Sequence, residues 1–168
     1  MAIISIIAAM DLKRTIGYNK SLPWPRPIPA DWENLFKVTK GKKMIMGRKS
    51  YEDKHRVWSE LGNIVISTNE NLMLENGFER ANSLKEALNI YKAEKEVFIL
   101  GGQRLFTEAL PLATNLHITI VHDVFEGDTF FPEFKSEDYE IISKKSIGIG
   151  PESPYPIELI HYFKLSKV

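Results

Sequence analysis

The chain has 168 residues, the length of one ordinary domain, and 43% of them are hydrophobic, which is enough to form a core. The 22 basic residues balance the 22 acidic ones, and this balance together with the apolar content excludes a disordered chain. It also argues against a non-specific nucleic-acid binder and against a polybasic membrane surface. Because the chain has no cysteine, disulfides, thiol nucleophiles and zinc–thiolate sites are excluded.

The sequence shows no segment that approaches the roughly 20 apolar residues of a membrane span. The apolar run from Ala2 to Met10 lacks a basic region before it and is followed directly by Asp11, so we expect a buried strand there and not a signal peptide. These features predict a cytoplasmic protein made of a single domain over residues 1–168.

Strand and helix patterns alternate through the first half of the chain. Residues 3–9 form a continuous apolar run, which is typical of a central parallel strand. Residues 11–30 contain Gly17 and four prolines, which exclude a helix or a central strand, and a loop of this length is usually functional. We then expect a helix at residues 31–39, a strand at 43–46 that leads through Gly47 into a helix near residue 48, and a strand at 64–67.

The second half continues this alternation and ends in a hairpin. Ser83 with Glu86 three residues later forms a capping box that predicts the start of a helix. Further on we expect a strand at residues 96–100, a helix at 103–110 and strands at 116–121, 139–145 and 157–165. The sequence therefore predicts an α/β domain whose mixed, mainly parallel sheet of about eight strands is flanked by about four helices, with a C-terminal antiparallel hairpin.

Two glycine motifs follow predicted strands, at the edge where ligands bind in such sheets. The turn Met46-Gly47-Arg48-Lys49-Ser50 combines a close-approach glycine with positive charges and a hydroxyl, as an anion site would. A plain turn with two solvated basic residues would have the same sequence. Gly101-Gly102 precedes a predicted helix, where it either seats a pyrophosphate or forms a structural turn.

Asp31 begins a predicted helix, where a carboxylate is most often a cap. Its neighbours are apolar, however, so a perturbed pKa and a bond to a protonated heterocycle are also expected of it. These neighbours are Ile28, Pro29, Ala30, Trp32 and Leu35. The histidines are scattered without metal-ligand spacing, and we expect no metal site. They are His55, His117, His122 and His161. Alone, these features predict a nucleotide-binding α/β domain with an apolar acidic pocket.

Taken together and in order, the motifs resemble those of the dihydrofolate reductase family over nearly the whole chain. Four separated motifs agree, which is more specific than any one of them. The first motif comprises the segments Ile7-Ala8-Ala9-Met10, Ile16-Gly17, Leu22-Pro23-Trp24 and Pro29-Ala30-Asp31. The second is Met46-Gly47-Arg48-Lys49-Ser50-Tyr51-Glu52, the third is Ile99-Leu100-Gly101-Gly102, and the fourth is Glu126-Gly127-Asp128-Thr129 with Phe131-Pro132.

The resemblance implies a dihydrofolate-reductase-like fold and NADPH as the cofactor. It implies hydride transfer to C6 of 7,8-dihydrofolate and protonation of N5, which gives tetrahydrofolate for one-carbon metabolism and makes the protein an antifolate target. Asp31, Trp24 and Leu22 are the implied catalytic residues. Asp31 would bond the pterin, Trp24 would help to hold a water near Asp31, and residues 11–26 would close over the nicotinamide.

The resemblance also implies a set of binding residues and a monomer that binds a small molecule, without nucleic-acid or membrane partners. The implied substrate contacts are Ile7, Ala8, Asp31, Trp32, Leu35, Lys54, Arg56, Leu100 and Thr119. The implied cofactor contacts are Ala9, Ile16, Gly17, Gly47, Arg48, Lys49, Ser50, Ser67, Thr68, Leu100, Gly101, Gly102, Gln103, Arg104, Leu105, Phe106 and Thr129. Gly101 and Gly102 would be joined by a cis peptide, and Arg48, Lys49 and Thr68 would favour NADPH over NADH.

The chain departs from the family pattern where an arginine usually holds the carboxylate of the substrate's glutamate tail. Leu61 occupies that position, and Arg26, Lys54 and Arg56 are the candidate replacements. Smaller departures are Leu35 for phenylalanine, Ser50 for threonine and Phe106 for tyrosine. Two alternatives follow, namely a related NADPH-dependent pterin reductase whose substrate has no glutamate tail, and a catalytically silent nucleotide-binding domain. The presence of Asp31 and Trp24 argues against the second alternative.

Overall fold

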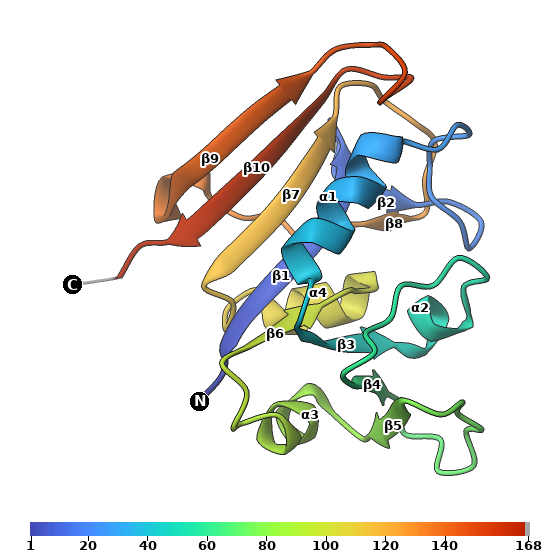
Figure 1. Ribbon diagram of the computed structural model, residues 1–168. Helices are drawn as coiled ribbons and strands as arrows, with labels where there is room; N and C mark the ends of the chain where they lie inside the picture. Colours follow the sequence, from blue (N-terminus) through green and yellow to red (C-terminus); the bar gives the residue numbers. More distant parts are fainter. Residues whose placement is uncertain (167–168) are drawn as a thin grey trace.

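An eight-stranded sheet is the frame of the computed structural model, which describes residues 1–166 (Figure 1). Its strand order is β5-β4-β3-β6-β1-β7-β10-β9. The strands are β1 (Ile3–Asp11), β3 (Lys43–Gly47), β4 (Asn63–Ile66), β5 (Phe78–Ala81), β6 (Glu96–Ile99), β7 (Asn115–Val121), β9 (Tyr139–Ile147) and β10 (Ile157–Lys164). Neighbours from β5 to β7 are parallel, and β10 pairs antiparallel with both β7 and β9.

Helices cover both faces of this sheet. They are α1 (Pro29–Thr39), α2 (Arg48–Glu52), α3 (Leu84–Ile90) and α4 (Gln103–Ala109), with a 3₁₀ turn, η1, at Ser136–Asp138. In Figure 1, α1 lies in front of β1 and β7, and α4 lies behind the sheet. The predicted fold class is confirmed, including the mainly parallel sheet of eight strands, the four helices and the C-terminal hairpin. The predicted domain ends at residue 168, and its last two residues lie outside the described part.

The central strands are apolar on both faces because each face is covered. Ile6, Ile45 and Ile99 are fully buried in the large core that includes residues of α3 and α4. Alternate residues face the other way, so that Met44 and Met46 pack with Tyr51 of α2. Strands buried on both sides read as continuous apolar runs, which is why the sequence predicts them readily.

Three strands differ from the sequence-based expectation. β5 was not predicted, because its residues Glu79 and Arg80 are polar and it lies at the edge of the sheet. β2 (Thr15–Gly17) and β8 (Thr129–Phe130) pair as a separate two-stranded sheet, so part of the predicted loop at residues 11–30 is extended. β2 precedes the four prolines, which therefore do not interrupt it. α1 begins two residues earlier than predicted, at Pro29, a residue that suits the first helical turn.

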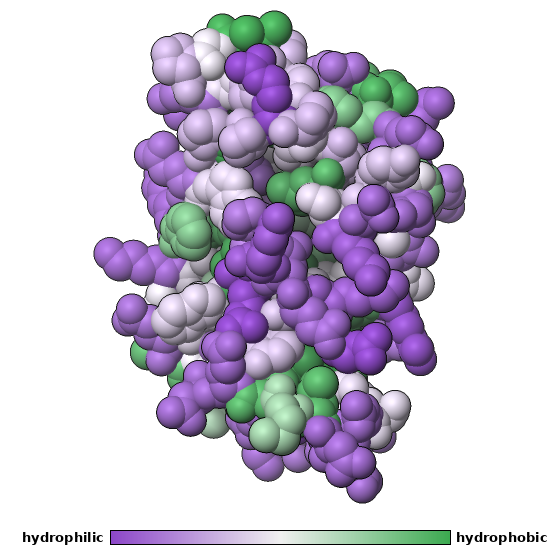
Figure 2. Space-filling model, turned by 90° about the vertical axis from the view of Figure 1, so that its right-hand side faces the viewer, coloured by the Kyte–Doolittle hydropathy of each residue, from purple (hydrophilic) through white to green (hydrophobic). Residues whose placement is uncertain are grey.

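The surface is mainly polar on the side shown in Figure 2, where hydrophobic residues gather only in small separate groups. Within residues 1–166, no helix is long and apolar enough to cross a membrane.

Two histidines stack on the α1 side of the sheet. His117 of β7 lies opposite His161 of β10, and their ring centroids are 4.1 Å apart. Phe98 packs 5.7 Å from the His117 ring. The pKa of His117 is lowered to about 4, mainly by burial and in smaller part by the neighbouring His161, while Glu96 opposes the shift. Burial likewise lowers the pKa of His161.

The free energy of unfolding should therefore fall as the pH decreases from about 6.5 to about 4. In that range the unfolded chain binds more protons than the folded one, so protonation favours unfolding. We expect His117 to account for about 1–2 kcal/mol of this loss, since one pKa unit is worth about 1.4 kcal/mol and solvent screens part of the effect at a half-buried ring. Urea unfolding of the wild type and of His117→Phe at pH 7 and pH 4.5 measures it. His55→Gln, at an exposed histidine, is the control and should keep the pH dependence of the wild type. If His117→Phe keeps it as well, groups other than His117 cause the loss of stability.

Candidate functional site

The parallel strands bring the predicted motifs to one edge of the sheet. Gly47 at the end of β3 lies opposite Ile66 of β4, and Ile66 lies opposite Ala81 of β5. On the other side, Ala9 of β1 lies opposite Thr119 of β7. This is the edge where open α/β sheets bind their ligands.

Asp31 meets the sheet through Thr119, and this contact is the centre of the site. Thr119 is 2% exposed, and its hydroxyl donates a hydrogen bond of 2.6 Å to Oδ1 of Asp31. The carboxylate makes no capping hydrogen bond in α1, so the capping alternative is wrong. The backbone N–H of Ala30 is satisfied instead by the carbonyl of Glu152, at 2.9 Å. The side chain of Asp31 is therefore available for another role.

Burial raises the pKa of the Asp31 carboxyl, and the hydrogen bond from Thr119 opposes this effect only in part. The surroundings explain the direction, because the start of α1 packs into an apolar cluster. Ile28 and Ala30 lie in this cluster with Trp24 and Val121. A carboxyl group that gains a proton more readily than usual can share a proton with a basic heterocycle.

Trp24 forms a buried wall in the cluster that holds the start of α1. Its side chain is 5% exposed, and its ring meets Phe125 edge-on at a centroid distance of 6.0 Å. Phe125 meets Tyr155 in the same way at 5.2 Å. Leu22, two residues earlier in the loop, is 40% exposed. The wall is thus fixed by three aromatic rings from distant segments, while Leu22 remains at the surface.

Asp11 holds the two loops at this edge, a role that the sequence does not predict. It is 1% exposed, and its carboxylate accepts the N–H groups of Lys13 and Thr15 through Oδ1 and that of Phe125 through Oδ2. An acidic residue at the end of a buried strand was the available signal. The partner Phe125 lies 114 residues away, so the bridging role was not visible from the sequence.

The two glycine turns lie against each other. The N–H of Gly47 donates to the carbonyl of Gly101 at 2.7 Å. The peptide between Gly101 and Gly102 is cis, as the resemblance implied. Gly101 has a φ of +101°, and a Cβ there would lie 2.8 Å from the ring of Phe106. A Cβ on Gly102 would meet nothing within 4 Å, so this backbone faces open space.

Charged and hydroxyl side chains surround these turns. Arg48 and Lys49 are exposed at the start of α2, and Ser67 and Thr68 follow β4. Arg48 lies 3.7 Å from Glu52, an exposed pair that is weak in water. Together with the open backbone of Gly102, these groups suit a ligand that carries phosphates.

The remaining predicted contacts divide between this edge and the core. Ile7 and Leu100 lie on the sheet face that Asp31 contacts, as Ala9 does, whereas the side chain of Ala8 packs on the opposite face and leaves only its backbone for a ligand. Trp32 and Leu35 are half-buried on α1. Ser50 is half-buried on α2.

On α4, the predicted cofactor residues differ in what they present. Leu105 and Phe106 are buried in the core, and Arg104 is exposed and pairs with Glu108. Gln103 accepts the N–H of Phe130 through its side chain, which connects α4 with β8. Ile16 and Gly17 lie in β2, and Gly17 pairs with Thr129 of β8. These contacts remain predictions.

Arg56 is already engaged with the protein. It donates to the carbonyl of Tyr51 at 3.0 Å and pairs with Glu75. Its guanidinium also lies 4.5 Å from the ring centroid of Tyr51 and 5.0 Å from that of Phe78. Lys54 is exposed, and Leu61 is 58% exposed. Arg56 therefore connects α2 with the segment around Glu75 and Phe78. Lys54 and Arg26 remain as candidates to bind the carboxylate of the substrate's glutamate tail.

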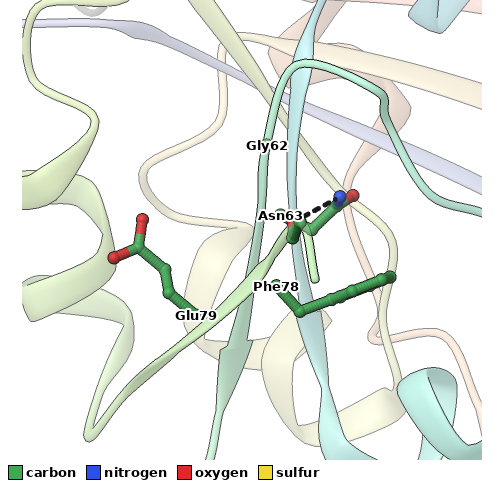
Figure 3. A pocket seen from close by; sticks show the side chains of 5 residues that line it. Gly62, Asn63, Phe78 and Glu79 are labelled. Atoms are coloured by element: carbon green, nitrogen blue, oxygen red, sulfur yellow. Dashed lines mark hydrogen bonds between the residues drawn. The ribbon is translucent and has the colours of Figure 1, made fainter. Parts of the chain in front are cut away.

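A shallow pocket of about 290 Å³ lies at the other ends of β4 and β5 (Figure 3). It is lined by Gly62, Asn63, Gly77, Phe78 and Glu79. Figure 3 shows Phe78 and Glu79 pointing to opposite sides of their strand. The Asn63 side chain is satisfied by Ser59 and Gly77 within the protein. This pocket therefore lies at the opposite edge of the sheet from Asp31 and is not part of the candidate site.

Replacing Asp31 by asparagine should stabilise the ligand-free protein at neutral pH. The raised pKa means that folding favours the protonated carboxyl, a contribution that is lost as the pH rises through the folded-state pKa. Asparagine has the same shape without the buried charge and can still accept from Thr119. We expect Tm to rise by about 2–4 °C, the shift that about 1 kcal/mol produces in a domain of this size. Calorimetry at pH 7.5 and 4.5 checks it; an Asp31→Asn variant that melts below the wild type at pH 7.5 contradicts the argument.

Comparisons with known proteins agree with this arrangement. The family model described as dihydrofolate reductase matches residues 3–164. Dihydrofolate reductase from Bacillus subtilis is 36% identical over 161 residues, which are 96% of this chain and 94% of that one. The Staphylococcus haemolyticus enzyme is 37% identical over 153 residues, 90% of each chain. The solved structure of Enterococcus faecalis dihydrofolate reductase, complexed with NADP(H) and RAB-propyl, has a TM-score of 0.86 at 28% identity and covers 98% of this chain and 97% of its own.

Proposed function

The chain belongs to the dihydrofolate reductase family, and on this premise we propose that Asp31, with Thr119, is the residue that binds and protonates the pterin in the NADPH-dependent reduction of 7,8-dihydrofolate to tetrahydrofolate. The observation that carries the assignment is the hydrogen bond of 2.6 Å from Thr119 to a carboxyl group in apolar surroundings. This contact lies at the sheet edge where the two glycine turns meet. A substrate bound there can therefore contact the Asp31 carboxyl group and the cofactor at the same time.

The residues at the strand ends fit NADPH. The open backbone of Gly102 suits a pyrophosphate, and Arg48, Lys49 and Thr68 suit a further phosphate. The solved relative from Enterococcus faecalis is described with NADP(H), which supports the same cofactor here. When bound, NADPH supplies the hydride that adds to C6 of the substrate.

Asp31 would supply the proton side of the reaction. As a carboxylate it accepts hydrogen bonds from the 2-amino group and N3 side of the pterin, which fixes the ring and favours the protonated, more electrophilic imine. Its raised pKa keeps it close to proton exchange. Trp24 helps to hold the water that carries the proton to N5, and Leu22 with the rest of residues 11–26 excludes bulk water. Acid assistance of this kind is worth about 10²–10⁴-fold in rate.

Asp31→Asn should therefore lower kcat by at least about 100-fold at pH 7.5, and by less at pH 5.5, where more of the substrate is already protonated. The measurement is NADPH oxidation with dihydrofolate at both pH values. Glu137→Gln, an exposed acid in η1, serves as the control and should leave the rate unchanged. Equal losses at the two pH values would contradict the proposed role, and a wild type without turnover on any pterin would leave the silent nucleotide-binding domain as the explanation.

A second candidate, a pterin reductase for a substrate without a glutamate tail, is favoured by one observation. Arg56 is occupied by Tyr51 and Glu75, and the apolar Leu61 is exposed, so the strongest tail-binding candidate is engaged elsewhere. Dihydrofolate remains the leading substrate because of the family. A wild type with equal kcat/KM for dihydrofolate and a tail-less dihydropterin would favour the second candidate.

Leu61→Arg should tighten dihydrofolate binding by about 1–3 kcal/mol, the scale of a charge-assisted hydrogen bond, and leave the tail-less pterin unaffected. Steady-state KM values for both substrates provide the test, with Leu61→Gln as the uncharged control. An unchanged KM for dihydrofolate in Leu61→Arg would mean that Lys54 or Arg26 already holds the tail.

We also infer that the protein is a monomer and is located in the cytoplasm. Its binding partner is then its small-molecule substrate and not a nucleic acid. The equal numbers of acidic and basic residues support this inference.

A further inference from the structure

Arg80 on β5 carries a charge that the proposed site does not use. Its Nη1 donates to the backbone carbonyl of Ser67 at 2.8 Å and to Oδ1 of Asn82. The side chain is half-buried. These two contacts fix the direction of the guanidinium and place it beyond the last paired residues of β4 and β5.

The strand register places Arg80 and the start of α2 at the same edge of the sheet, with β4 between them. Val65 lies opposite Arg80, and the next pair, Ile66 and Ala81, is the last in both strands. Ile66 also lies opposite Gly47, the residue before Arg48. Neighbouring strands are about 4.8 Å apart, so the ends of β3, β4 and β5 lie within about 10 Å of one another. Arg48, Thr68 and the head of Arg80 therefore line one short stretch of the edge.

The guanidinium of Arg80 also has no acidic partner. Across residues 1–166, no carboxylate lies within ion-pair distance of it, whereas Arg14, Arg48, Arg56 and Arg104 each have one. Both hydrogen bonds leave from Nη1, so the donors on Nη2 and Nε have no partner in the described part of the chain. A fork of two parallel donors is the arrangement that binds a phosphate in bidentate fashion.

We propose that Arg80 binds the 2′-phosphate of the adenosine half of NADPH and thereby helps the enzyme to select NADPH over NADH. This inference rests on the proposed function, because it needs NADPH at this edge. The two cofactors differ only by that phosphate, whose negative charge the unpaired guanidinium can accept. The Ser67 carbonyl and Asn82 hold one end of the fork, and the other end meets the phosphate next to the hydroxyl of Thr68.

The test compares Arg80→Gln with the wild type in direct binding of NADPH and NADH, followed by fluorescence. We expect the Kd for NADPH to rise at least about tenfold in Arg80→Gln and the Kd for NADH to stay within about twofold. Arg80→Lys keeps the charge without the fork and should lie between the two. Lys92→Gln, an exposed cation just after α3, is the control and should change neither Kd.

A purely structural role for Arg80, fastening β5 to the segment after β4, predicts a different pattern. Both cofactors would then bind more weakly by the same factor, and that result would overturn the proposal. An unchanged Kd for NADPH would overturn it as well. A matching pair of fragments, 2′,5′-ADP and 5′-ADP, repeats the comparison without the nicotinamide, and only the first should lose affinity. A failure of the proposed function would give a different result from a failure of the proposal for Arg80. The wild-type protein would then bind NADPH but would not reduce dihydrofolate.

Discussion

The parallel register of the strands from β5 to β7 is the constraint on which the rest of the structure depends. It brings the ends of β3, β6, β1 and β7 to one edge, although these ends are separated by up to about two thirds of the chain. A glycine turn, a second glycine turn and a threonine hydroxyl thus become neighbours without any local sequence signal that joins them. Within the eight-stranded sheet, the hairpin of β9 and β10 departs from this rule, and it extends the sheet beyond β7 by antiparallel pairing. The candidate site lies at this edge, and not at the edge where the same strands begin, because the glycine turns and the charged side chains follow the strands in the sequence.

The hydrogen bond from Thr119 of β7 fixes the Asp31 carboxyl group to this sheet, although the charged form of that group is unfavourable in its surroundings. A carboxyl group in apolar surroundings costs free energy when charged, and this is the physical origin of its raised pKa. The cost is tolerated because α1 is fixed independently of Asp31. Pro29 suits the first turn, the Ala30 N–H is bonded to Glu152, and Ile28 is buried in the cluster with Trp24. The helix therefore keeps its position whether or not the carboxyl is charged, which is what a proton-exchanging group requires.

The sequence predicts the parts of this arrangement whose signal is local. The apolar runs of β1 and β6, the capping box at Ser83 and the glycine turns can each be read within a few residues, and the Ser83 side chain does accept the N–H of Glu86. The edge strand β5 and the β2–β8 pair were missed because their pairing depends on distant partners and their residues are not distinctly apolar. Asp11 and Arg80 were missed for the same reason. Their importance comes from contacts with Phe125 and with Ser67, which no window of the sequence contains. The connecting role of Arg56 also became visible only when Glu75 and Phe78 were seen beside it.

The distribution of arginines separates the two ends of the ligand site. Arg56 is neutralised by Glu75 and packed on two rings, so it contributes rigidity near the expected substrate tail but little unpaired positive charge. Leu61 adds none. At the opposite end, Arg80 has no acidic partner within residues 1–166 and lies at the same edge of the sheet as Arg48 and Thr68. Unpaired charge attracts an anion, whereas a paired arginine must first give up its partner. The phosphate of the cofactor can therefore be bound by an arginine that is already fixed in place, whereas the carboxylate of the substrate is left to Lys54 or Arg26, which have no acidic partner within residues 1–166.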